Sequence, residues 1–135
     1  MEKVLYYEAQ DGDQVVKKQM RFKATAALAL KYKEQFGSDL FKDLKTVQAS
    51  WHKDGDQPGY FDRNADISIV YNIVWAMAKS ANPDLPPPIE WFDSFEDGLP
   101  IWVWFAELSP MMTASFSGTA KNLPETESQQ QQSAS

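Results

Sequence analysis

The sequence predicts a mainly α fold: a helical domain of about five helices, with a short N-terminal β-hairpin before it and a disordered C-terminal tail after it. Three observations lead to this prediction. Apolar residues recur at helical spacing from Ala24 to Phe116. Strand-like alternation is confined to the residues before Ala24. Beyond Gly118 the chain turns polar and ends in Gln and Ser.

The chain of 135 residues is long enough for one core and short for two. We therefore expect a single domain over residues 1–117. Residues 118–135 hold almost no apolar side chain, so we expect them to form a disordered tail.

Residues 3–23 have the pattern of a β-hairpin. The sequence Asp11-Gly12-Asp13 is a turn signal, and apolar residues alternate with polar ones on both sides of it. The strand-like positions are Val4 and Tyr6 before the turn and Val16, Met20 and Phe22 after it.

Two amphipathic helices should follow as a helical hairpin. The first has an apolar face of Ala24, Leu28, Tyr32 and Phe36, with Thr25 as its N-cap and Gly37 as its end. The second begins after Ser38 or Asp39, and its apolar face consists of Leu40, Leu44, Val47 and Trp51.

A polar loop at residues 53–59 should precede the main core helix, residues 64–81, which is apolar around most of its circumference. Residues 84–88 hold three successive prolines and should form a stiff extended spacer. Two further helices are expected at residues 89–95 and 100–116. Asp97 is the expected N-cap of the last helix, and Pro110 should kink or split it.

The net charge of −6 argues against a nucleic-acid partner, because binding to phosphates requires clustered Lys and Arg. The absence of Cys excludes disulfides, thiolate catalysis and Cys-based zinc sites. The N-terminus lacks the apolar core of a signal peptide, and no apolar run reaches the length of a membrane span. We expect a protein of the cytoplasm with no membrane partner.

The polar residues do not form a recognisable catalytic or metal site. Asp54, Asp56 and Asp62 suggest a calcium loop, but Pro58 and Ala65 occupy positions where an EF-hand places ligands. His52, the one histidine, has no evident partner and suits a helix C-terminus. The pair Glu96-Asp97 lies at a helix boundary. We therefore expect no enzyme activity, no metal and no cofactor.

The aromatic residues are the candidates for a binding function. A cluster of aromatic side chains forms either a domain core or an anchor for a partner. Residues 102–105 read Trp-Val-Trp-Phe, and on a helix four consecutive side chains point in different directions. At least one of them should therefore face a partner or another subunit of a homo-oligomer.

The order of segments resembles the tail assembly chaperones of long-tailed phages and prophages. The resemblance spans residues 15–116, and its most specific parts are Phe36-Gly37-Ser38-Asp39-Leu40 and Glu90-Trp91-Phe92-Asp93-Ser94-Phe95. Further matching parts are the buried segment from Ile73 to Lys79, the proline spacer and the final Trp-rich helix.

The resemblance implies a non-enzymatic protein of the bacterial host cytoplasm, absent from the mature virion. Its implied partners are the tape measure protein, which it keeps soluble, the major tail (tube) protein, and its own longer frameshifted form. This chain then corresponds to the short form. We expect the partner-binding surface to be bordered by Trp91, Phe92, Trp102, Trp104 and Phe105.

Three other functions remain open from the sequence. A structural tail component such as a tube subunit would need a sequence rich in strands. A small helical adaptor unrelated to phage would have the same soluble, binding character. A small acidic enzyme relying on carboxylates alone is a third alternative.

Overall fold

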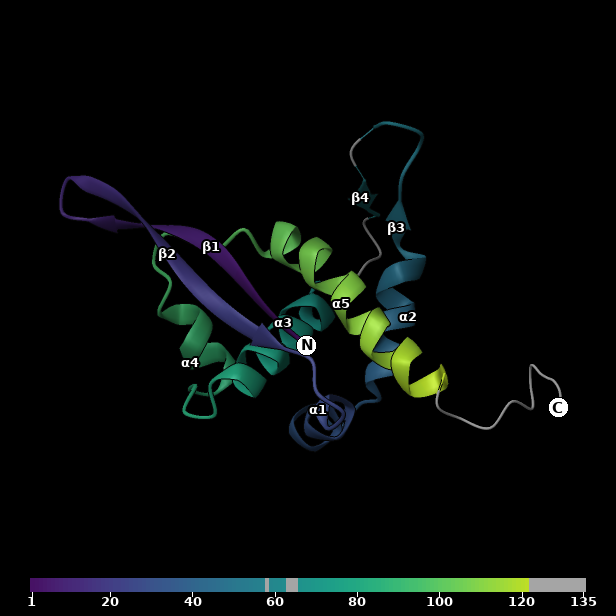
Figure 1. Cartoon of the computed structure of the whole chain (residues 1–135). Helices are drawn as coiled ribbons and strands as arrows, with labels where there is room; N and C mark the ends of the chain where they lie inside the picture. The colour runs from purple at the N-terminus through teal and green to yellow at the C-terminus, as the bar shows by residue number, and fades with distance from the viewer. Residues whose placement is uncertain (58, 63–65, 122–135) are drawn as a thin grey trace, which may run out of the picture.

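The computed structural model describes residues 1–57, 59–62 and 66–121 (Figure 1). In chain order the elements are β1 (Glu2–Asp11), β2 (Gln14–Lys23), α1 (Leu28–Phe36), α2 (Leu40–Ala49), β3 (Trp51–His52), β4 (Tyr60–Phe61), α3 (Ile67–Ala81), α4 (Pro88–Asp93) and α5 (Ile101–Lys121). The strands form two separate antiparallel pairs, β1 with β2 and β3 with β4. The tail was predicted at residues 118–135, but α5 continues to Lys121; the remaining residues, 122–135, lie outside the described residues.

The prediction of a mainly α fold is wrong. In its described part the chain has five helices and two antiparallel two-stranded sheets, so strands are a substantial part of the fold. The hairpin β1–β2 is not short, because each strand has ten residues. Backbone pairing continues through polar residues to the turn, and alternation of apolar residues reveals only the part near the core. The chain is an α+β protein.

The hairpin β1–β2 closes through a tight turn at Gly12, whose φ of 64° is in the left-handed region. Asp11 pairs with Gln14 next to this turn, and Glu2 pairs with Lys23 at the other end. The turn was predicted from Asp11-Gly12-Asp13, and it is confirmed. Glycine is favoured here because a side chain would strain a backbone with positive φ.

The apolar face of β1 is the opposite of the one predicted. Leu5 is buried and Tyr7 packs against the core, whereas Val4 and Tyr6 are exposed. All of residues 4–7 are apolar or aromatic, so alternation does not distinguish the two faces of this strand. On β2 the prediction holds for Phe22, which is fully buried.

Helices α1 and α2 form the predicted helical hairpin. Gly37 ends α1 with a φ of 71°, and the side chain of Asp39 caps α2 by accepting from the backbone N–H of Lys42. The prediction that Thr25 caps α1 is wrong, because α1 begins at Leu28 and its N-cap, Ala27, makes no side-chain hydrogen bond.

A buried tyrosine connects these two helices. The Tyr32 hydroxyl donates to Asp43 Oδ2 at 2.7 Å, and the Ser38 hydroxyl donates to Asp43 Oδ1 at 2.9 Å. Burial raises the pKa of the Tyr32 phenol, and the bond to Asp43 raises it further, so this group stays protonated and donates.

Helix α3 is the centre of the core, as predicted, and begins at Ile67 with Asp66 as its N-cap. It contacts β2, α1, α2 and α5. The proline spacer is fixed to α3 by two bonds: Trp75 Nε1 donates to the Pro86 carbonyl at 2.9 Å, and Lys79 Nζ donates to the Leu85 carbonyl at 2.8 Å.

Helix α5 runs from Ile101 to Lys121 with Pro110 inside it, so the proline does not split the helix. The prediction that Asp97 caps α5 is wrong, because its carboxylate accepts from the backbone N–H of Gln10 at 3.0 Å. In Figure 1, β1–β2 lies on one side of α5 and β3–β4 on the other. Among the described residues, no helix combines the length and apolar character of a membrane span.

Candidate partner-binding groove

The second hairpin, β3–β4, occupies the region predicted as a helix end and an exposed loop. Trp51 pairs with Phe61, and His52 pairs with Tyr60. The prediction that Trp51 belongs to the apolar face of α2 is wrong, because α2 ends at Ala49 and Trp51 starts β3. A strand of two residues is too short for alternation to reveal it.

Side chains hold this short hairpin together. The rings of Trp51 and Phe61 meet edge to face, with centroids 4.7 Å apart and planes at 61°. His52 stacks on Tyr60 at 5.3 Å. Cross-strand aromatic pairs of this kind each contribute up to about 1 kcal/mol. These ring contacts add stability that a backbone ladder of only two residue pairs does not provide.

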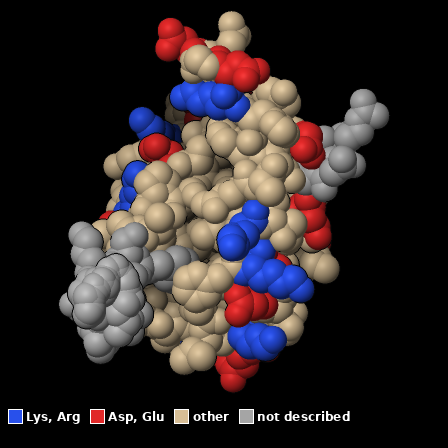
Figure 2. Space-filling model, turned by 90° about the vertical axis from the view of Figure 1, so that its right-hand side faces the viewer, with Lys and Arg blue, Asp and Glu red and all other residues tan. Residues whose placement is uncertain are grey.

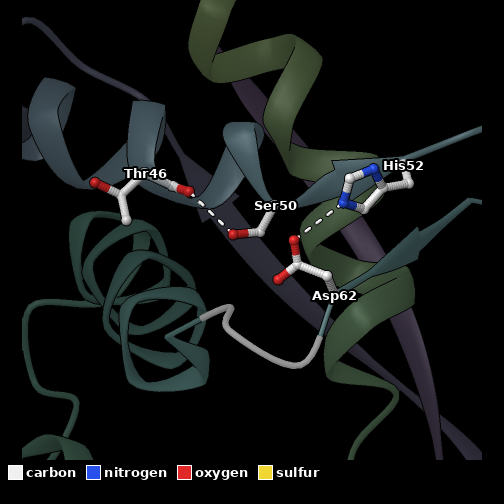
Figure 3. Close-up of polar contacts among 4 residues, drawn as sticks. All are labelled: Thr46, Ser50, His52 and Asp62. Atoms are coloured by element: carbon white, nitrogen blue, oxygen red, sulfur yellow. Dashed lines mark hydrogen bonds and ion pairs between the residues drawn. The ribbon is translucent and has the colours of Figure 1, made fainter.

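A polar cluster fastens the base of the hairpin to the end of α2 (Figure 3). His52 Nε2 lies 3.0 Å from Asp62 Oδ2. The Asp62 backbone N–H donates to the Ser50 carbonyl at 2.9 Å, and the Ser50 hydroxyl donates to the Thr46 carbonyl at 3.4 Å. The sequence did not predict Asp62 as the partner of His52, because the two residues are ten positions apart and meet only when the hairpin forms.

Gly59 allows the Trp51 indole to lie against the backbone of the hairpin. A Cβ atom at position 59 would stand 1.9 Å from Cζ2 of Trp51, which no side chain can occupy. Glycine is therefore required at position 59 for the contact with the indole ring. The sequence indicated only that Gly59 belongs to a polar loop.

Helix α5 provides the other wall next to β3–β4. The Trp102 ring lies 4.5 Å from the Phe61 ring, and Phe105 lies 6.1 Å from it. Trp102 is 37% exposed, whereas Trp104 is 1% exposed. Side chains two positions apart on a helix point in nearly opposite directions. Trp102 and Val103 are exposed, whereas Trp104 and Phe105 are buried; that one of residues 102–105 faces a partner or another subunit stays a prediction.

Two adjoining hollows lie between β3–β4 and α5, with volumes of about 250 Å³ and 510 Å³. They share Trp51, Phe61 and Ala106, so we treat them as one surface and call it the aromatic groove. Its remaining lining residues are Gln48, Gly59, Tyr60, Trp102, Val103, Phe105, Ser109 and Pro110. Among the residues that the structure describes, this lining includes no charged side chain.

Figure 2 views the molecule from the side that carries β3–β4. Uncharged surface with a hollow occupies the upper middle of this face, and Lys, Arg, Asp and Glu residues lie above it, to its left and in a band from the centre right downward. Trp51, Tyr60, Trp102 and Val103 are all exposed large apolar or aromatic side chains. A concave aromatic surface with a polar rim is the usual chemistry of a protein-binding site.

The structure separates the five residues predicted to border the partner-binding surface. Trp102 and Phe105 lie at the aromatic groove, Phe105 as a buried wall. Trp104 is buried beneath β1–β2. Trp91 is buried and Phe92 is half-buried on α4, where their rings meet at 4.8 Å.

Sequence reasoning missed Trp51, Tyr60 and Phe61 as groove residues. The available signal was a pair of aromatic residues directly after a Gly-containing turn, with a tryptophan before the turn. That pattern is compatible with a hairpin of aromatic cross-strand pairs, but it spans too few residues to be distinguished from a loop.

The groove is suited to binding apolar side chains. Its polar neighbours, His52 and Asp62, are paired with each other at 3.0 Å. In the ranges 1–57, 59–62 and 66–121, no three His, Cys, Asp or Glu residues come together as a metal site would require. The chemistry available at the groove is therefore burial of aliphatic or aromatic surface.

Comparisons with known proteins do not assign the chain to a family. No family model, curated protein or solved structure matches it. What the chain does is therefore inferred from the groove and from the resemblance of its sequence segments.

Proposed function

We propose that this chain is the short form of a phage tail assembly chaperone, acting without enzymatic activity in the cytoplasm of the bacterial host. In this role it binds the tape measure protein, keeps it soluble and helps to recruit the major tail protein. The observation that supports the proposal most is the aromatic groove, an exposed apolar surface on a chain of net charge −6.

A tape measure protein is expected to be a very long helix with apolar stripes that remain exposed until tube subunits cover them. An amphipathic helix binds a groove through apolar side chains spaced three and four residues apart. The groove offers aromatic side chains from two elements, Trp51 and Tyr60 from the hairpin and Trp102 from α5. Aromatic walls adapt well to varied aliphatic side chains along such a stripe.

The charge of the chain suits a chaperone that must not aggregate with its client. Net negative charge of this size keeps a small domain soluble and repels other copies of it. The described residues that line the groove are uncharged, so an apolar client surface meets no unpaired ion on them.

The test is co-expression of the full chain with a tagged tape measure protein from the same genome. We expect the tape measure protein to stay soluble and to carry the untagged chain through purification. Trp51→Ser combined with Trp102→Ser should abolish both effects, because it removes aromatic surface from both walls of the groove.

The matched control is Leu30→Ser combined with Ile89→Ser, since both side chains are exposed and apolar and neither lines the groove. The control should retain full solubilisation. If the wild-type chain leaves the tape measure protein insoluble even when the longer frameshifted form is also supplied, the chaperone proposal fails. A small adaptor with another partner for the same groove then becomes the better interpretation.

A further inference from the structure

The two outer edges of the hairpin β1–β2 differ in what they can bind. In an antiparallel pair, alternate residues bond across the ladder, and the residues between them direct their backbone N–H and C=O outward. Met1 and Ala24 form a hydrogen-bonded pair: the Ala24 N–H donates to the Met1 carbonyl at 2.9 Å, and the Met1 amino group donates to the Ala24 carbonyl at 3.2 Å. Every second residue pair from there along the ladder is then also hydrogen-bonded. Even-numbered residues of β1 and odd-numbered residues of β2 therefore point their backbone groups away from the hairpin.

The outer edge of β1 is covered by other parts of the chain. Trp104 Nε1 donates to the Tyr6 carbonyl at 3.2 Å, and the Gln10 N–H donates to Asp97 Oδ2 at 3.0 Å. Both Tyr6 and Gln10 are even-numbered, as the ladder pattern requires. Helix α5 and the loop before it thus occupy two of the positions at which another strand would pair, Tyr6 and Gln10.

The outer edge of β2 is unpaired within the described residues, with the end of α3 next to Gln19 and Arg21. Its outward backbone groups belong to Val15, Lys17, Gln19, Arg21 and Lys23. Within the described residues, no other helix, strand or loop hydrogen-bonds to these groups. In Figure 1 the distal half of the hairpin extends away from the helices. A row of unpaired donors and acceptors is a template for an additional strand.

A hollow lies next to this edge. It has a volume of about 270 Å³ and is lined by Gln19, Met20 and Arg21 of β2 together with Ala81 and Asn82 at the end of α3. An added strand directs alternate side chains towards the two faces of the sheet. One side chain of such a strand would enter this hollow, which gives the edge a means of selecting its ligand.

The charge of β2 indicates the chemistry of the ligand. The strand contains four of the 13 Lys and Arg residues of the chain and no Asp or Glu. Arg21 is paired with Glu2 at 2.6 Å, whereas Lys17 makes a cation–π contact with Tyr6 at 4.9 Å and stands opposite Glu8 in the ladder. Among the described residues, Lys17, Lys18 and Lys23 form no ion pair within 4.0 Å. A second copy of β2 would place basic residues opposite basic residues, which is unfavourable.

We propose that the outer edge of β2 binds an extended acidic segment of a partner protein as a third strand. Backbone bonds to Lys17, Gln19 and Arg21 supply the affinity, and the basic side chains select glutamate or aspartate in the ligand. This site lies on the opposite side of α5 from the aromatic groove and does not depend on the chaperone proposal.

The probe is a blocked synthetic peptide of ten residues, the length of β2, that alternates glutamate with valine. The full chain is titrated with it, and backbone amide shifts are followed by NMR. A peptide alternating lysine with valine is the charge-reversed control. We expect the acidic peptide to shift the amides of Lys17, Gln19 and Arg21 and to bind at least about tenfold more tightly than the basic one.

Proline substitutions test the backbone contact directly. Gln19→Pro removes an outward N–H without removing a ladder bond, and Val4→Pro does the same on the covered β1 edge. We expect Gln19→Pro to weaken binding about tenfold, the equivalent of one hydrogen bond, and Val4→Pro to leave it unchanged. If Gln19→Pro unfolds the hairpin, the proposal is judged by the wild-type titration alone, that is, by whether the acidic peptide shifts the amides of Lys17, Gln19 and Arg21.

The proposal is overturned if the acidic peptide causes no shifts at these amides, if both peptides bind equally, or if the two proline variants weaken binding equally. Because the readout involves neither the tape measure protein nor the groove, failure here is distinct from failure of the chaperone proposal.

Discussion

The two hairpins of this protein are stabilised in different ways. β1–β2 has ten-residue strands, a continuous ladder and a face that contributes Leu5 and Phe22 to the core. β3–β4 pairs two residues on each strand and depends on ring contacts and the His52–Asp62 pair. A long hairpin is held by its backbone and its core face, whereas a short one is held by its side chains.

Helix α5 contacts both hairpins through tryptophans two positions apart. Trp104 lies 5.1 Å from Phe22 and 5.8 Å from Tyr7, and its indole N–H bonds to the Tyr6 carbonyl. Trp102 lies 4.5 Å from Phe61 on the opposite side and stays partly exposed. One turn of helix thus contributes Trp104 to the core on one side and Trp102 to the aromatic groove on the other.

The largest expected effect is from Trp104→Ala. Removing a fully buried tryptophan leaves a cavity, and substitutions of this kind cost about 3–5 kcal/mol. Trp102→Ala, the matched control two positions away, should cost about 1 kcal/mol, because part of its surface already faces solvent. Urea unfolding followed by far-UV circular dichroism measures both. Equal costs for the two variants would show that α5 does not separate the hairpins in this way.

Gly59→Ala should disrupt the short hairpin with little effect on the long one. The new methyl group would overlap the Trp51 ring, so the indole must swing out of the groove. Overpacking costs about 1–3 kcal/mol, and we expect the lower end because Trp51 can move into solvent. The indole N–H resonance of Trp51 should shift strongly, while the amides of β1 and β2 stay in place.

The control for this variant is Gln57→Ala, an exposed position in the same loop. It should leave the Trp51 resonance unchanged. A Gly59→Ala protein with an unaltered Trp51 signal would contradict the close packing of the indole on the hairpin.

The sequence predicted the elements whose signals are local and repeated. The turn at Gly12, the end of α1 at Gly37, the cap at Asp39 and the core helix α3 all follow from residue type and spacing. These features depend on a few neighbouring residues, so one chain is enough to recognise them.

The parts that were missed depend on contacts between distant residues. Asp97 was assigned as a helix cap, yet its carboxylate bonds to Gln10 at the far end of the chain. Half of the groove comes from β3–β4, where Trp51 and Phe61 meet only after the intervening loop has folded back. Of the five predicted binding residues, spacing alone did not distinguish the exposed Trp102 from the buried Trp104. Trp104 is buried because β1–β2 covers it, and Trp102 stays partly exposed beside β3–β4; this difference becomes visible only when both hairpins are placed around α5.

A double-mutant cycle of His52→Ala and Asp62→Ala tests how much the polar pair contributes to the short hairpin. The two side chains are 43% and 35% exposed, so a coupling of about 0.2–1 kcal/mol is expected. Asp62 makes further contacts, so its single substitution should cost more than that of His52. The cycle isolates the pair from those contacts. A coupling of zero would show that the aromatic pairs and the backbone bonds hold the hairpin without help from this pair.

The smallest effect is expected at the Arg21–Glu2 pair, which crosses the long hairpin at 2.6 Å. The hydrogen bond from Arg21 holds the pKa of the Glu2 carboxyl below its ordinary value of 4.5. A depressed carboxyl pKa adds stability above the ordinary value, and that contribution is lost as the pH falls through the lowered one. Arg21→Gln should return the Glu2 pKa towards 4.5, as followed by carboxyl NMR titration.

Lys18→Gln is the control for this prediction, because Lys18 lies in the same strand and is not a cause of the Glu2 shift. It should leave the titration of Glu2 unchanged. Arg21→Gln should also leave the β1–β2 amide pattern intact, since the ladder and the core face hold this hairpin without the ion pair. If the hairpin instead loosens at the end away from its turn, where Glu2 pairs with Lys23, then β1–β2 relies on side chains as β3–β4 does. The contrast between the two hairpins would then be one of degree.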